Sequence, residues 1–167
     1  MPQRVVVRDE PKRKTRLEPD VRAAWRWIGW LGVLLTVVGV GDFALAWYPS
    51  AFGTPEWEFG TVAASFSGLP LVTMGFAALL GSAVASGRRW LVIGTASVLA
   101  LSGIGVVALF LLFLTNVPMA VQGAEGVIAL GIKKVVVKTS MLGVGFGIGY
   151  LVGAYAAFRH AVLSRRG

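Results

Sequence analysis

The chain contains no cysteine and only one histidine, His160, among its 167 residues. The lack of cysteine excludes disulfides, thiol catalysis and cysteine-ligated metals. A single histidine excludes a haem held between two histidines of one chain. The sequence also has no glycine-rich phosphate loop and no nucleophile elbow. We therefore expect a protein that is not an enzyme and that holds no cofactor or metal.

Charge is scarce as well. Asp, Glu, Lys and Arg make up 14% of the chain, whereas a soluble domain carries roughly a quarter. Hydrophobic residues reach 56%, and the mean hydropathy is +0.73. A helix that crosses a bilayer needs about 20 mainly apolar residues, and the chain has four such stretches. The predicted spans cover about 27–48, 61–85, 90–114 and 138–158.

These spans predict an all-α fold, an integral membrane four-helix bundle that fills residues 25–160. Residues 1–24 read as a flexible basic cytoplasmic tail and residues 161–167 as a second short tail. We expect a multi-pass protein of the inner or plasma membrane. Its partners would be the lipid bilayer and other membrane subunits or further copies of itself.

Basic residues predict the orientation. Most Lys and Arg lie in the N-terminal tail, at Arg88 and Arg89, and at the C-terminal end. Residues 49–60 contain neither Lys nor Arg but include two glutamates, and the third loop carries Glu125. Because cytoplasmic loops retain positive charge, both termini are predicted inside. The net charge of +8 is explained by this topology, and no nucleic-acid partner is expected.

The sequence allows more than one interpretation of where some spans begin and of how many there are. Residues 126–137 would either extend the last span or lie along the membrane surface. Pro70 would kink the second span or mark the start of its buried part. Ala44-Leu45-Ala46 allows a signal-peptide reading with three remaining spans. The aromatic belts at both ends of the first apolar run favour a span instead.

Asp42 is the main candidate site, because a carboxylate within a span is costly and usually functional or paired. It lies about 24 Å along the helix from Arg26, where equal depth on other spans predicts Thr73 and Ser102 as polar neighbours. The alternative is that Asp42 reaches water at the interface. Lys138 is a candidate partner, although snorkelling or pairing with Glu56, Glu58 or Glu125 competes with that pair.

Two further features indicate contacts with other proteins. The last span carries a glycine-rich face that would pack within the bundle or against another subunit: Gly143, Gly145, Gly147, Gly149 and Gly153. The outer loop carries Glu56, Trp57 and Glu58, which would anchor the loop at the membrane surface or dock an envelope partner.

The stretch Pro55-Glu56-Trp57-Glu58-Phe59-Gly60-Thr61-Val62 is followed by Leu69-Pro70-Leu71 and Gly75. This pattern resembles small bacterial four-span proteins of unknown function and is similar to the HpsJ-like proteins associated with polysaccharide secretion or exosortase systems. The resemblance covers roughly the first 115 residues, and Asp42 matches a late aspartate of the first span. The loop before the last span is shorter here. The resemblance implies an accessory role and names no catalytic residue.

Two functions follow from these features. The first is a non-catalytic accessory or scaffold subunit of a bacterial envelope complex, with a link to polysaccharide secretion implied by the resemblance. The alternative is a small transporter or channel component that uses Asp42 within the membrane.

Overall fold

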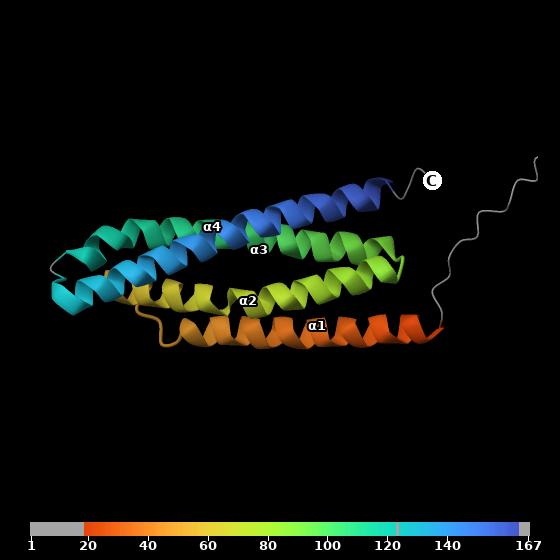
Figure 1. Cartoon of the computed structure of the whole chain (residues 1–167), viewed down its shortest axis with the longest axis horizontal. Helices are drawn as coiled ribbons and strands as arrows, with labels where there is room; N and C mark the ends of the chain where they lie inside the picture. Colours follow the sequence, from red (N-terminus) through yellow and green to blue (C-terminus); the bar gives the residue numbers. More distant parts are fainter. Residues whose placement is uncertain (1–18, 123, 164–167) are drawn as a thin grey trace, which may run out of the picture.

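The computed structural model describes residues 19–122 and 124–163, which form four α-helices joined by short connections (Figure 1). The helices are α1 (Pro19–Ala46), α2 (Pro55–Ala85), α3 (Arg89–Val121) and α4 (Gly126–Leu163). All four are long and apolar enough to cross a membrane. The predicted all-α fold with four membrane spans is therefore confirmed.

The helices begin earlier than the apolar runs. Proline opens both α1 and α2, at Pro19 and Pro55, where its missing N–H costs no helical hydrogen bond. Acidic residues in each first turn interact favourably with the helix dipole. Residues 19–24, predicted as tail, therefore belong to α1. The rest of that tail, residues 1–18, and residues 164–167 lie outside the described residues.

The second half of the chain also extends its predicted spans. Helix α3 continues past Pro118 to Val121, and residues 126–137 form the first turns of α4. Pro70 does not mark the start of the buried part of α2, because Val62 and Phe66 are buried before it. Helix formation follows backbone hydrogen bonding, which extends beyond the segment that must be apolar for the membrane.

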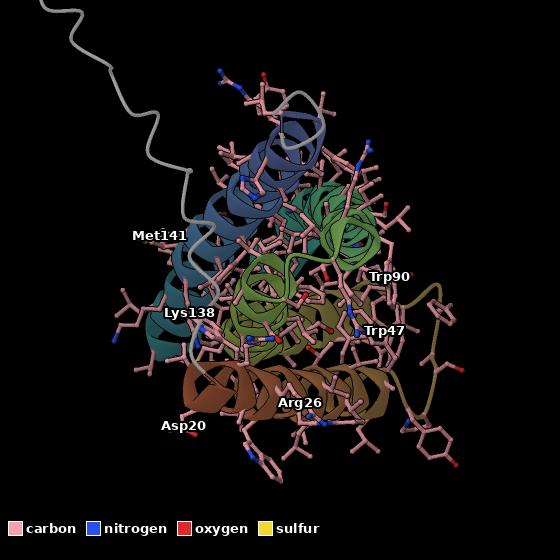
Figure 2. The ribbon with its side chains drawn as sticks, turned by 90° about the vertical axis from the view of Figure 1, so that its right-hand side faces the viewer. Asp20, Arg26, Trp47, Trp90, Lys138 and Met141 are labelled. Carbon is pink, nitrogen blue, oxygen red and sulfur yellow. The ribbon has the colours of Figure 1, made fainter. Side chains whose placement is uncertain are left out.

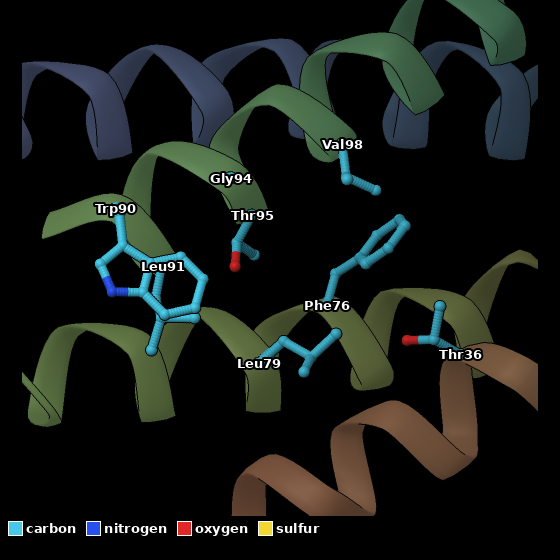
Figure 3. Close-up of a pocket in the computed structure, with 8 residues that line it drawn as sticks. All are labelled: Thr36, Phe76, Leu79, Trp90, Leu91, Gly94, Thr95 and Val98. Carbon is cyan, nitrogen blue, oxygen red and sulfur yellow. The ribbon is translucent and has the colours of Figure 1, made fainter. Parts of the chain in front are cut away.

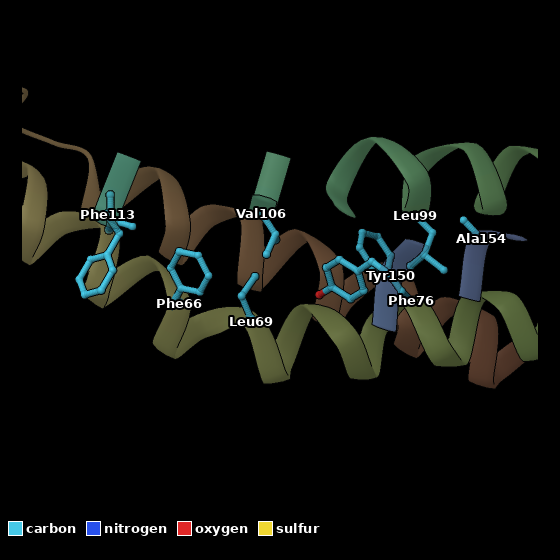
Figure 4. Close-up of a cluster of buried hydrophobic side chains, with 9 residues drawn as sticks. Phe66, Leu69, Phe76, Leu99, Val106, Phe113, Tyr150 and Ala154 are labelled. Atoms are coloured by element: carbon cyan, nitrogen blue, oxygen red, sulfur yellow. The ribbon is translucent and has the colours of Figure 1, made fainter. Parts of the chain in front are cut away.

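Helix α2 is the centre of the bundle. It packs against each of the other three helices, and α3 packs against α4, whereas α1 packs against α2 alone. The buried core consequently comes from α2, α3 and α4. It runs along the bundle axis (Figure 4) through the following side chains: Val62, Phe66, Leu69, Phe76, Leu99, Val106, Phe113, Tyr150 and Ala154. A second core of small residues lets the same three helices approach closely near residues 83–96 and 157–161.

The start of α1, the connection between α2 and α3, and the end of α4 lie at one end of the bundle (Figure 1). The α1–α2 and α3–α4 connections lie at the opposite end. Arg88 and Arg89 mark the first end, and Glu58 and Glu125 mark the second. Lys133 and Lys134, in the first turns of α4, also lie toward the second end, so basic residues are not confined to the first end of the described chain.

Candidate functional site

Asp42 lies on an exposed face of α1, four residues before the helix ends at Ala46. Its carboxylate rests against α2 at Gly68. A Cβ atom added to Gly68 would lie 3.0 Å from Asp42 Oδ2, so the absence of a side chain at Gly68 makes room for the carboxylate. Asp42 is thus at the edge of the α1–α2 contact and outside the core.

Lys138 of α4 approaches the same part of α2. Its Nζ donates a hydrogen bond of 3.3 Å to Ser67 Oγ, and Ser67 in turn donates to the Ala63 carbonyl at 3.3 Å. Ser67 and Gly68 are consecutive, with Cα atoms about 3.8 Å apart. The side chains of Asp42 and Lys138 therefore reach consecutive positions of α2, each from a different neighbouring helix. We call Asp42, Ser67, Gly68 and Lys138 the polar patch.

The polar patch faces outward. Asp42, Ser67 and Lys138 are all exposed. In the view along the bundle, Lys138 lies on the opposite side from Trp47 and Trp90 (Figure 2). No hydrogen bond joins the two charged side chains within residues 19–122 and 124–163.

The other two predicted neighbours of Asp42 lie elsewhere. The Thr73 hydroxyl donates to the Leu69 carbonyl at 2.8 Å and also meets the Tyr150 hydroxyl at 2.8 Å, inside the α2–α4 contact. Ser102 is half-buried on α3, a helix that α1 does not touch. The criterion of equal depth misplaced the level of Asp42, because Asp42 meets Gly68 whereas Val72 meets Gly39. It carries no information on which side of a helix a residue faces.

The glycines of α4 divide between two faces. Gly143 packs under Phe110 and Phe66, Gly147 lies against Val107, and Gly153 lies against Leu99. Gly145 and Gly149 are exposed and would have open space around an added Cβ. The first three therefore pack within the bundle, and only the last two lie on a face that another chain could approach.

Helices α1 and α2 approach closely along a row of glycines that was not predicted from the sequence. We call Gly29, Gly32 and Gly39 on α1, together with Gly75 on α2, the glycine seam. A Cβ on Gly32 would lie 2.9 Å from the Gly75 carbonyl oxygen. A Cβ on Gly39 would lie 3.3 Å from the Val72 backbone nitrogen. Such small faces let helices in lipid pack backbone to backbone. The spacing of these glycines on one helix face was the available signal.

The predicted outer loop of Glu56, Trp57 and Glu58 is the first turn of α2. Trp57 is half-buried and meets Trp47 edge-on, with ring centroids 5.7 Å apart. Glu58 accepts hydrogen bonds from the Gly53 N–H and from Asn116 Nδ2, each at 2.9 Å. Trp57 and Glu58 thus make contacts within the molecule, and of the three residues only Glu56 is exposed.

The described part of the chain contains no group of three His, Asp or Glu residues placed to hold a metal ion. Comparisons with protein-family models, with curated proteins and with solved structures found no match to this chain. The function is therefore argued from the geometry, and the polar patch is the arrangement with the most chemical content.

Proposed function

We propose that the chain is a non-catalytic accessory or scaffold subunit of a membrane complex. The observation that carries the proposal is the outward-facing polar patch at membrane depth. Asp42 lies about 24 Å along α1 from Arg26, and it stays exposed although its carboxylate lies against Gly68. Asp42 lies four residues before the end of α1. A charged side chain there costs less than the value of about 2.5–3.5 kcal/mol at the membrane centre, but covering it with a polar partner helix is still favourable.

Lys138 and Ser67 extend this surface with donors beside the acceptor. A partner helix that offers both a donor and an acceptor would satisfy Asp42 and Lys138 together, because each keeps hydrogen-bonding capacity. Interhelical hydrogen bonds of this kind are worth about 0.6–2 kcal/mol each in membranes. The occupant that fits this patch is a membrane-spanning helix of another subunit with one or two polar residues at matching depth.

The alternative function, a transporter or channel component, uses Asp42 to line a path through the bundle. Asp42 is on the helix that contributes nothing to the core. The interior next to Ser67 is filled by the buried Phe66, whose ring packs against Phe110 at a centroid distance of 6.5 Å. These observations favour the scaffold over the transporter.

The resemblance of residues 55–75 to the HpsJ-like proteins selects the first complexes to examine, the polysaccharide-secretion assemblies of a bacterial envelope. A placement in the inner membrane with both termini in the cytoplasm is part of the same proposal. It follows from the positive-inside distribution of arginine and lysine.

The test is purification of the tagged chain from its native membrane in mild detergent, with mass spectrometry of co-eluting proteins. We expect a stoichiometric membrane partner that is lost on Asp42→Asn and on Lys138→Gln. Asp20→Asn on α1 and Lys134→Gln on α4 are matched controls and should keep the partner. If the partner binds the Asp42→Asn variant equally well, the scaffold proposal based on this patch fails.

Ion flux in proteoliposomes separates the two functions. A transporter should lose ion- or pH-dependent flux on Asp42→Asn while remaining folded. A scaffold should show no flux before or after that substitution.

A further inference from the structure

An apolar groove opens on the side of the bundle that carries Trp47 and Trp90, away from the polar patch (Figures 2 and 3). Its volume is about 300 Å³. The groove exists because α1 packs on α2 and leaves α3 untouched. Phe76 and Leu79 of α2 form its floor, and Thr36 of α1 lies at one end (Figure 3).

The α3 wall of the groove descends from the end of the bundle that bears Arg88 and Arg89. Trp90 and Leu91 lie at that end, followed by Thr95 and Val98 deeper along the helix (Figure 3). From Trp90 to Val98 the wall is about 12 Å long. Gly94 contributes no side chain, and an added Cβ there would meet open space. The groove is therefore open and apolar, and it runs along α3 away from the end of the bundle that bears Arg88 and Arg89.

Charge and hydrogen bonding at the groove indicate the occupant. Arg88 and Arg89 are exposed directly beside the interfacial Trp90, and arginine binds phosphate with a planar set of donors. The Thr95 hydroxyl faces the groove (Figure 3), and within residues 19–122 and 124–163 no hydrogen bond occupies it. A hydroxyl of this kind can donate to an ester carbonyl. Phosphate, ester and hydrocarbon follow one another in this order in a phospholipid.

We propose that this groove is a binding site for an anionic phospholipid of the leaflet at the Arg88 end. One acyl chain lies between α1 and α3 over Phe76 and Leu79, and the headgroup phosphate lies against Arg88 and Arg89. Thr95 donates to an ester carbonyl of the same lipid. The lipid fills the space that α1 leaves beside α3, so it joins the peripheral helix to the core of the bundle.

The experiment uses the full chain, purified in mild detergent and delipidated. It is titrated with palmitoyl-oleoyl phosphatidylglycerol or with palmitoyl-oleoyl phosphatidylcholine. Native mass spectrometry then counts the bound lipid molecules. Each basic residue near an anionic headgroup contributes about fivefold in affinity, so we expect the wild type to prefer phosphatidylglycerol by roughly 30-fold. The double variant Arg88→Gln/Arg89→Gln should bind both lipids with nearly equal affinity.

A second pair of variants tests the acyl-chain groove. Gly94→Leu fills the groove and should weaken the binding of both lipids. Gly105→Leu is the matched control on the same helix, because its added side chain also meets open space but lies outside the groove. Equal affinity of the wild type for the two lipids would overturn the headgroup assignment. Indistinguishable lipid binding by Gly94→Leu and Gly105→Leu would overturn the groove itself.

Discussion

Thr73 and Tyr150 join α2 to α4 through a single pair of hydroxyl groups 2.8 Å apart. Tyr150 is buried, and its ring also packs edge-on against Phe76 at a centroid distance of 5.6 Å. Tyr150→Phe keeps the ring and removes the hydrogen bond. Such bonds in membrane proteins contribute about 0.6 kcal/mol on average, so the free energy of unfolding should fall by about that amount.

The measurement is equilibrium unfolding in mixed micelles of a mild detergent and dodecyl sulfate. Tyr155→Phe is the control, since Tyr155 is exposed on the same helix. A larger loss for Tyr155→Phe than for Tyr150→Phe would contradict the role given to this pair.

Gly75 is the residue where an added side chain has the least room. A Cβ there would collide with the Thr36 hydroxyl and would lie 2.8 Å from the Thr36 backbone nitrogen. Gly75→Val should therefore separate α1 from α2 and cost about 1–3 kcal/mol of stability, the usual range for overpacking. The same unfolding assay measures it. Gly105→Val, which adds a side chain in open space, should change stability far less.

At the level of single residues, the sequence predicted some features of the candidate site and not others. Asp42 could be singled out from the sequence, because its charge interrupts an apolar run. Its contact with Gly68 could not be derived, since that depends on the rotation of α1 about its own axis. The glycine seam was overlooked because glycines in α4 are more numerous, although number says nothing about which of them face a neighbour.

The ends of the helices depend on hydrogen bonds that cannot be derived from the hydropathy of the sequence. Glu58 connects the first turn of α2 to Gly53 in the preceding connection and to the buried Asn116 of α3. Glu58→Ala removes two hydrogen bonds to a charged group and should reduce stability by roughly 3 kcal/mol. It should also speed hydrogen exchange at the Gly53 amide.

Glu56→Ala is the matched substitution in the same turn, on a side chain that is exposed. It should leave the exchange rate of Gly53 unchanged. Equal exchange rates at Gly53 in the two variants would show that Glu58 does not hold this connection in place.

The number and order of the helices were predictable, because each needs its own apolar run to cross a bilayer. The lengths of the helices could not be predicted from the apolar runs. Helix α4 contains 38 residues, or about 57 Å, and its first turns carry Lys133 and Lys134 in a segment whose apolar pattern is broken. Continuous backbone hydrogen bonding carries the helix through that break.

For the whole molecule, the testable property is topology. Ser50 lies in the α1–α2 connection and Ser86 directly follows α2, at opposite ends of the bundle (Figure 1). Because the chain has no cysteine, single cysteines at these positions can be labelled without background. Membrane-impermeant maleimide should label Ser50→Cys from outside and Ser86→Cys from the cytoplasm. Labelling of both from one side would contradict the four-span topology.

The glycine seam should make the α1–α2 contact respond to temperature differently from hydrophobic contacts in water. Glycine has no rotamers to lose when helices associate, so this contact forms at almost no cost in side-chain entropy. Its attraction comes mainly from dispersion between two closely spaced backbones. Hydrophobic contacts in water weaken on cooling, whereas an enthalpic contact of this kind strengthens. We therefore expect α1 to hold more tightly to α2 in the cold, and warming to release this helix before the other three separate.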